Sequence, residues 1–99
     1  MKVVLFGGTT EGRTLSGVLA ALGAQVTVCV ATDYGRQEQG TCAGVVVRAG
    51  RLEAAEMEEV LRGAALCVDA THPYAMRAGE NIAAACAHTG VPRLRLLRR

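Results

Sequence analysis

The sequence predicts an α/β protein, in which a parallel sheet of about five strands is doubly wound with helices on both faces. Two observations carry this prediction. Short apolar runs alternate with segments whose apolar residues recur at helical spacing. The chain is 51% hydrophobic, yet only 3% of it is aromatic, which is typical of aliphatic strands buried beneath helices. We treat residues 1–99 as one domain, because this length supports one core and not two.

The expected elements follow one another in strict alternation. The strands are expected at residues 3–6, 25–31, 45–48, 65–69 and 93–97. Helices are expected at residues 11–22, 52–62 and 75–88, with Gly23 and Gly90 as their C-terminal stops. In the first helix Leu15, Val18, Leu19 and Leu22 share a face that is expected to pack on the sheet. The polar stretch 32–44 shows little periodicity and is expected to be a loop.

Composition argues against several classes of protein. A net charge of +2 is too small to favour nucleic acid or a membrane surface as partner. No apolar run approaches the roughly 20 residues that span a bilayer. The cysteines form no CxxC pair, and no histidine stands at metal-ligand spacing from them, which predicts reduced thiols, a cytoplasmic protein and no metal site. They are Cys29, Cys42, Cys67 and Cys86.

A glycine-bearing segment joins the first strand directly to the first helix. It reads Gly7, Gly8, Thr9, Thr10, Glu11, Gly12. Gly7 and Gly12 stand where the first and third glycines of the GxGxxG fingerprint stand, with Thr9 in place of the second. Backbone N–H groups at the helix start would face a pyrophosphate, and the Thr9 and Thr10 hydroxyls would donate to the same phosphates. The segment predicts a Rossmann-like, dinucleotide-binding loop.

The same residues come close to a phosphate-binding P-loop. The pattern departs from GxxxxGK[ST] at Arg13, where that motif requires lysine. A planar guanidinium does not replace the compact lysine charge, and Glu11 would place a negative charge beside the phosphates. A degenerate P-loop phosphotransferase is therefore the weaker alternative.

The residues after the second strand predict contacts with the adenosine ribose of a nicotinamide cofactor. Asp33 suits the 2′-hydroxyl of NADH, whereas Thr32 and Arg36 suit the 2′-phosphate of NADPH. Tyr34 would lie against the adenine. Arg36 favours NADPH, and NADH stays open.

The segment after the fourth strand, residues 68–75, is the most distinctive part of the sequence. The fourth strand would end beside the first, so this segment would face the nicotinamide end of the cofactor. His72 and Tyr74 are the candidate catalytic residues, as hydrogen-bond or proton donors, and Thr71 is a candidate cofactor contact. Pro73 keeps His72 out of helical conformation. A structural role for His72 is the alternative.

These segments together resemble the precorrin-6A reductase family. The resemblance rests on residues 7–12 and 68–75, on Asn81 and Cys86, and on the Gly-Val-Pro of residues 90–92, and it runs along the whole chain. It implies transfer of a hydride from NADPH to a double bond of the precorrin-6A macrocycle, or of cobalt-precorrin-6A, giving the corresponding precorrin-6B. It implies two Rossmann-like lobes around the substrate, of which this chain matches the first. The missing second lobe, or a homodimer, would complete the cleft.

The resemblance also implies roles for individual residues. The cofactor loop would comprise Gly7, Thr9, Thr10, Glu11 and Gly12, and the cleft wall residues 71–74. The alternative function is a non-catalytic dinucleotide-binding module, in which the same loop binds a nucleotide and nothing is reduced.

Overall fold

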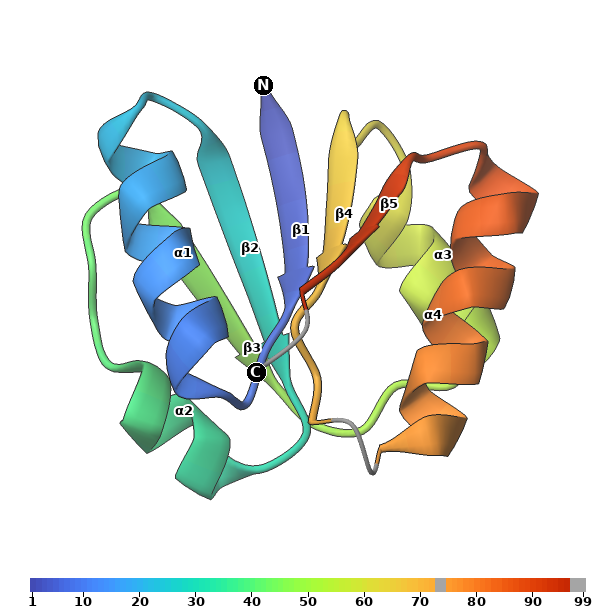
Figure 1. Ribbon diagram of the computed structural model, residues 1–99, viewed down its shortest axis with the longest axis horizontal. Helices are drawn as coiled ribbons and strands as arrows, with labels where there is room; N and C mark the ends of the chain where they lie inside the picture. The colour runs from blue at the N-terminus through green and yellow to red at the C-terminus, as the bar shows by residue number, and fades with distance from the viewer. Residues whose placement is uncertain (73–74, 97–99) are drawn as a thin grey trace.

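The computed structural model describes residues 1–72 and 75–96. Its elements alternate between strand and helix along the chain. They are β1 (Lys2–Phe6), α1 (Thr10–Ala21), β2 (Gln25–Val30), α2 (Asp33–Gln39), β3 (Val45–Ala49), α3 (Ala54–Leu61), β4 (Leu66–Asp69), α4 (Met76–Thr89) and β5 (Arg93–Arg95). The strands form one parallel sheet in the order β3-β2-β1-β4-β5. Figure 1 shows α1 and α2 on one face of the sheet and α3 and α4 on the other. The doubly wound α/β fold is confirmed.

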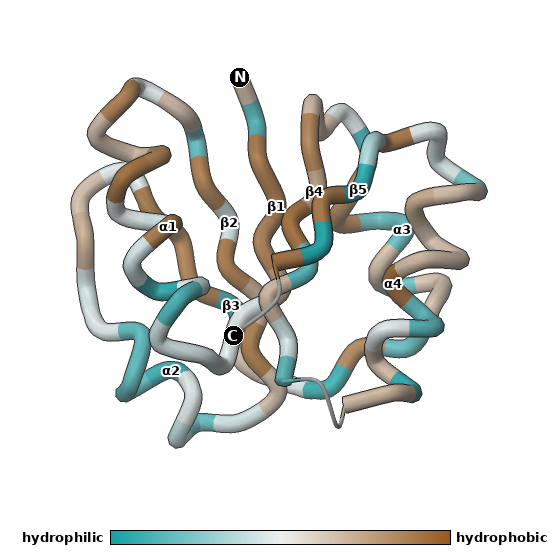
Figure 2. The backbone as a smooth tube through the Cα atoms, viewed as in Figure 1, coloured by the Kyte–Doolittle hydropathy of each residue, from teal (hydrophilic) through white to brown (hydrophobic). Residues whose placement is uncertain are grey.

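The core lies on both faces of β1, the central strand. Val3 and Leu5 point into the cluster beneath α1, and Val4 and Phe6 point into the cluster beneath α3 and α4. All four side chains are buried, because β1 is covered on both faces and paired on both edges. Figure 2 shows the same concentration of hydrophobic residues along β1, β2 and β4. The buried middle strands of the sheet thus hold the loops at their carboxyl ends in place.

The stretch 32–44 is not all loop, because α2 forms at Asp33–Gln39. Thr32 caps this helix, and its side-chain oxygen accepts a hydrogen bond from Gly35 N at 3.0 Å. At the other end Gln39 is buried, and its Nε2 donates to Ser16 Oγ of α1 at 2.8 Å. The sequence prediction was wrong here because α2 has no apolar face. A cap and one buried polar contact hold it instead.

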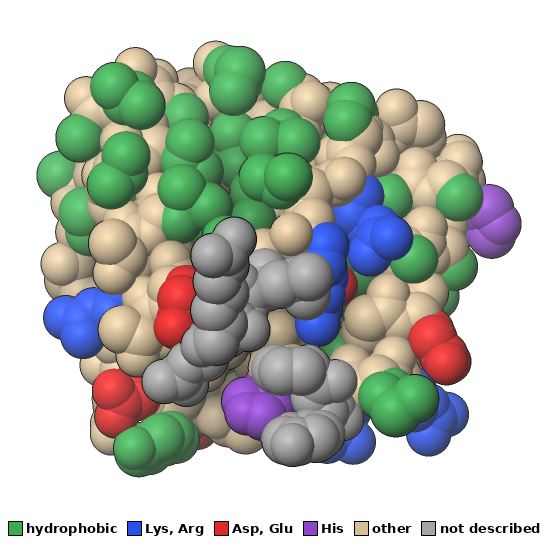
Figure 3. All heavy atoms as spheres, in the orientation of Figure 1, with side chains coloured by type: hydrophobic (Ala, Val, Ile, Leu, Met, Phe, Trp, Pro, Cys, Tyr) green, Lys and Arg blue, Asp and Glu red, His purple; other side chains and the backbone are tan. Residues whose placement is uncertain are grey.

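The buried face of α1 differs in part from the prediction, since Leu15 and Leu19 pack against the core as expected and Val18 and Leu22 do not. Val18 and Leu22 are 50% and 79% exposed, whereas Gly12 and Ser16 are buried. The absence of a side chain at Gly12 allows the helix to approach the sheet on that side, which turns the Val18–Leu22 side outward. In Figure 3 hydrophobic side chains gather over the upper half of the face that carries α1, and charged side chains lie mainly in the lower half. No helix among the described residues is long and apolar enough to cross a membrane.

Candidate functional site

The strand order reverses direction at β1, which places a candidate site at the carboxyl end of this strand. The chain moves outward from β1 to β2 and β3, and then crosses to β4 and β5 on the other side. The residues that follow β1 and β4 stay bonded to their neighbours, since Gly7 N donates to Cys29 O at 2.8 Å and Ala70 N donates to Phe6 O at 2.9 Å. In open α/β sheets ligands bind in the crevice at such a reversal.

Glycines in the loop after β1 are required by close packing and by backbone conformation. A Cβ on Gly12 would lie 3.0 Å from Ala70 Cβ and 3.3 Å from Leu5 Cδ2, so a side chain would push α1 away from the sheet. Gly8 has φ +110°, a conformation that favours glycine. The first turn of α1 therefore lies at the carboxyl end of β1, where the N–H groups of the helix start are suited to an anion.

Thr9 has a structural role that the sequence prediction missed. It is the N-cap of α1, and its Oγ1 accepts a hydrogen bond from Gly12 N at 3.2 Å. The same hydroxyl donates to Ala70 O at 2.8 Å, which joins the loop after β1 to the loop after β4. Its only proton is used there, so donation from the Thr9 hydroxyl to a phosphate, as predicted, does not fit this geometry.

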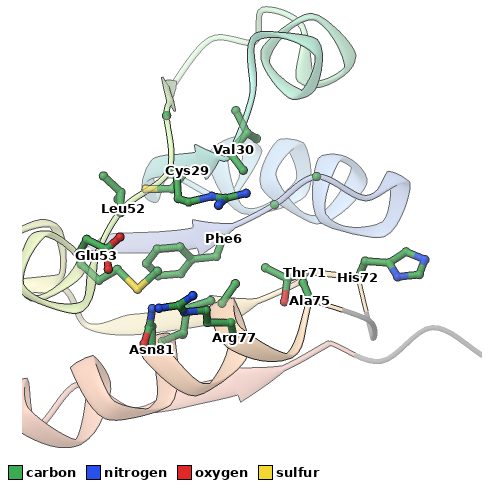
Figure 4. A pocket seen from close by; sticks show the side chains of 18 of the residues that line it. Phe6, Cys29, Val30, Leu52, Glu53, Thr71, His72, Ala75, Arg77 and Asn81 are labelled. Carbon is green, nitrogen blue, oxygen red and sulfur yellow. The ribbon is translucent and has the colours of Figure 1, made fainter.

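A cavity of about 480 Å³ opens beside this loop, on the face that carries α3 and α4. Its walls come from the carboxyl ends of the strands, from the start of α3 and from the first turns of α4. The lining residues are Phe6, Gly7, Gly8, Cys29, Val30, Ala31, Gly50, Arg51, Leu52, Glu53, Met57, Thr71, His72, Ala75, Met76, Arg77, Ala78, Asn81 and Ile82. Figure 4 shows the Phe6 ring in the middle, with Cys29 and Leu52 on one side and Arg77 and Asn81 on the other. An apolar floor with a polar rim is the usual character of a small-molecule site.

The structure brings together only some of the predicted site residues. Gly7, Gly8, Thr71 and His72 line the cavity. The other described candidates lie outside its lining, namely Thr9, Thr10, Glu11, Gly12, Thr32, Asp33, Tyr34 and Arg36. Tyr74, the second catalytic candidate, and Pro73 lie outside the described residues.

The ribose candidates after β2 are all exposed on α2 or at its cap. Tyr34 is 71% exposed, and its hydroxyl is hydrogen-bonded to Glu38, which raises the pKa of the tyrosine. Asp33 and Arg36 stand on the same short helix, one turn apart. These side chains therefore stand at the surface, outside the cavity lining.

The loop after β4 is held by a buried carboxylate. Asp69 Oδ1 accepts hydrogen bonds from Thr71 N at 3.1 Å and from Thr71 Oγ1 at 2.6 Å. Arg95 Nη1, from β5, lies 2.7 Å from the same oxygen and donates to Thr71 Oγ1 at 3.0 Å. Arg93 Nη1 is 3.9 Å from Asp69 Oδ2. This network holds Thr71, which lines the cavity, in a fixed position.

His72 follows this fixed point and occupies the outer end of the cavity. It is exposed, and in Figure 4 its imidazole points away from Phe6. The Thr71 contacts hold the backbone on its N-terminal side. This position suits a group at the mouth of a cleft.

The polar side chains of the cavity that the sequence prediction missed come from two segments. Arg51 and Glu53 follow β3, and Arg77 and Asn81 stand one turn apart on α4. The prediction concentrated on the loops after the first, second and fourth strands. The rule that ligands bind at the carboxyl ends of strands applies equally to the third and was the available signal.

The cysteine in the cavity wall gives the protein a predicted pH dependence. Burial raises the pKa of the Cys29 thiol to about 11, although Arg48 and Lys2 oppose the shift. Between the ordinary thiol pKa, about 9, and this raised value the folded protein keeps a proton that the unfolded thiol releases. The contribution of the thiol to stability is therefore fully present below about pH 9 and declines as the pH rises towards 11. We expect a loss of about 2 kcal/mol in the free energy of unfolding over this window.

Urea denaturation at about pH 8.5 and about pH 10.5 measures this loss. Cys29→Ala should remove that share of the pH dependence, since alanine does not titrate. An unchanged dependence in this variant would show that other groups cause it.

Two further observations bear on the alternatives. The described residues contain no group of three or more histidine, cysteine or acidic side chains that could hold a metal ion. Arg13, in the P-loop lysine position, has its Nη2 4.0 Å from an ideal Cβ on Gly40, at the end of α2. This guanidinium therefore lies beside the end of α2. A P-loop lysine would instead have to point towards the phosphates.

A doubly wound parallel sheet with a glycine loop at the reversal of strand order defines the Rossmann-like class of α/β proteins. The family model for precorrin-6x reductase CbiJ/CobK matches residues 2–99. The chain thus belongs to the precorrin-6x reductase family, whose members are oxidoreductases of cobalamin biosynthesis.

Individual relatives agree with this family. The chain is 37% identical over 91 residues to a cobalt-precorrin-6A reductase of Salmonella typhimurium, covering 90% of this chain and 34% of that protein. It is 35% identical over 95 residues to the Priestia megaterium protein of the same name, covering 94% and 37%. It therefore spans about a third of the length of these relatives.

Solved structures show the same likeness. A CobK precorrin-6A reductase superimposes on the whole chain with a TM-score of 0.81 at 29% identity, and 38% of that protein is covered. A structure described as a putative F420-dependent NADP-reductase from Arthrobacter matches with a TM-score of 0.63 at 27% identity. The match covers 96% of this chain and 44% of the Arthrobacter chain.

Proposed function

We propose that this chain supplies the NADPH-binding lobe of a reductase that acts on the precorrin-6A macrocycle, with or without cobalt, and yields precorrin-6B. The observation that carries the proposal is the glycine loop at the reversal of strand order, whose Gly7 and Gly8 line the cavity together with Phe6. The family match supports the substrate, and the relatives' names support both forms of it. Because those relatives are biosynthetic enzymes, we expect a cytoplasmic protein.

The residues present fit a dinucleotide. Gly7 and Gly12 let the loop and the first turn of α1 lie close against the sheet, since a Cβ at either position would meet Val28, Leu5 or Ala70. The N–H groups of the helix start so placed suit a pyrophosphate. The cavity lies within the range of about 300–1,000 Å³ of small-molecule sites, and its floor is apolar enough for a flat ring. We assign the side of this cavity formed by the ends of β2 and β3 to the adenosine half, because the ribose of such cofactors lies at the end of β2.

The protein's own residues would position the reactants. The cofactor supplies the hydride when it is bound, and the chain provides orientation and electrostatics. Thr71 and His72 would form the wall next to the substrate. His72 and Tyr74 remain the candidates for the group that protonates the reduced carbon.

Isothermal titration of the chain with NADPH, NADH and ATP plus Mg²⁺ tests the cofactor. We expect NADPH to bind most tightly and ATP plus Mg²⁺ not to bind. Tighter binding of ATP would contradict the proposal in favour of a P-loop protein. Equal affinity for NADH would remove the preference for a phosphorylated ribose.

We also expect no turnover of precorrin-6A by residues 1–99 alone, because the family's cleft needs a second lobe. An absorbance assay with NADPH measures it. Formation of precorrin-6B would contradict this expectation and would require a second copy of the chain to complete the cleft, which its oligomeric state would show.

A further inference from the structure

We propose that Arg51, and not Arg36, binds the 2′-phosphate of NADPH and sets the preference over NADH. This inference rests on the proposed function and deepens it. The sequence places this role on Thr32 and Arg36, directly after β2. The structure shows that Arg51, which follows the neighbouring strand β3, also lies next to the carboxyl end of β2.

Register places Arg51 beside the end of β2. Val30, the last residue of β2, is paired with Ala49, the last residue of β3. One residue later Gly50 N donates to Val30 O at 2.9 Å, which holds the chain against β2 as it leaves the sheet. Arg51 is the next residue and lines the cavity together with Val30 and Ala31. The adenosine ribose is expected at this edge.

The charges around the two arginines differ. Arg36 shares α2 with Asp33 and Glu38, so the helix carries one positive and two negative side chains. A phosphate with its own negative charge would be repelled there. Arg36 also lies outside the cavity lining.

The cavity is more favourable to a phosphate. Its lining contains Arg51 and Arg77 against a single carboxylate, that of Glu53. Glu53 is the N-cap residue of α3 and forms a capping box with Glu56, so its charge faces the positive end of a helix. Among the described residues Arg51 has no ion-pair partner, whereas Arg93 and Arg95 are engaged with Asp69.

Arg77 stands on a different wall. It belongs to the first turns of α4, and Figure 4 shows it with Asn81 on the side of Phe6 opposite to Cys29 and Leu52. The ribose end of the site, at β2 and β3, is therefore the side of Arg51. A guanidinium there can bind a phosphate with two parallel hydrogen bonds.

Titration of Arg51→Ala with NADPH and NADH, and with the fragments 2′,5′-ADP and 5′-AMP, tests the assignment. The affinity for NADPH and 2′,5′-ADP should fall by about tenfold to a hundredfold, as expected for charge-assisted hydrogen bonds. The affinity for NADH and 5′-AMP should change less than about threefold, because neither carries the 2′-phosphate. Arg51→Lys should recover only part of the loss.

Arg62→Ala is the matched control, since it removes the same charge from the end of α3, outside the cavity lining, where the Arg62 side chain is paired with Glu59 on the surface. It should leave all four affinities unchanged, and thermal unfolding of each variant checks its fold. A selective loss in Arg36→Ala or Arg77→Ala, with normal binding by Arg51→Ala, would overturn the assignment while the proposed function stands. Failure of the unaltered chain to bind any of the four would instead overturn the proposed function.

Discussion

Gly12→Val is expected to abolish NADPH binding. A Cβ at this position would lie 3.0 Å from Ala70 Cβ and 3.3 Å from Leu5 Cδ2, and valine adds two methyl groups beyond it. Overpacking of this kind costs about 1–3 kcal/mol in stability. Relief of the clash moves the first turn of α1 away from the sheet, and with it the Thr9–Ala70 hydrogen bond that joins the two loops. Isothermal titration with NADPH, beside urea denaturation, measures both effects.

Gly17→Ala is the control on the same helix. Nothing lies within 4 Å of a Cβ at Gly17, so alanine fits and should stabilise the protein by about 0.4–1 kcal/mol. NADPH affinity should not change. Normal binding by Gly12→Val in a folded protein would reject the loop as the phosphate site.

The alternation of elements could be predicted because the buried strands leave a clear signal. Residues 3–6 and 65–69 are apolar runs between helical patterns, and the structure places β1 and β4 side by side at those positions. Gly90 adopts φ +73° and caps α4, as its place after the last periodic residue predicts. These features depend on local sequence and on the general rule for parallel sheets.

Features that depend on tertiary contacts could not be predicted in the same way. The helix α2 is held by the Thr32 cap and by the contact of Gln39 with Ser16 across 23 residues of chain, and no pattern within α2 indicates that second contact. The orientation of α1 follows from the close approach at Gly12, which a periodicity that counts only large apolar residues does not include.

The candidate site shows the same division. The glycine loop is a local motif and was found, whereas the cavity is formed by residues that are distant in sequence. Arg51 becomes a cavity residue only because β3 pairs with β2 in a particular register. Thr9 looks like a phosphate ligand in the sequence, yet its hydroxyl donates to Ala70. Strand order and side-chain contacts decide both cases.

Asp69→Ala is expected to destabilise the protein by about 2–3 kcal/mol, because it removes the acceptor of Thr71 and the counter-charge of Arg95 together. Breaking a fully buried ion pair costs about 3–5 kcal/mol, and the 28% exposure of the Arg95 side chain reduces that figure. Urea denaturation measures the loss. Asp69→Asn keeps an oxygen for Thr71 and should lose less.

Arg93→Ala tests whether stability depends on the hydrogen bonds of Asp69 or on the positive charges near it. Its Nη1 lies 3.9 Å from Asp69 Oδ2, and its side chain is 39% exposed, so we expect less than about 1 kcal/mol. If Arg93→Ala and Asp69→Ala were equally unstable, the hydrogen bonds to Thr71 would not be what holds this part of the structure. If only Asp69→Ala is unstable and its NADPH affinity also falls, the buried carboxylate positions Thr71 and the cavity wall. His72 follows Thr71 in the chain, so this result would also identify Asp69 as the residue that sets the position of the first catalytic candidate.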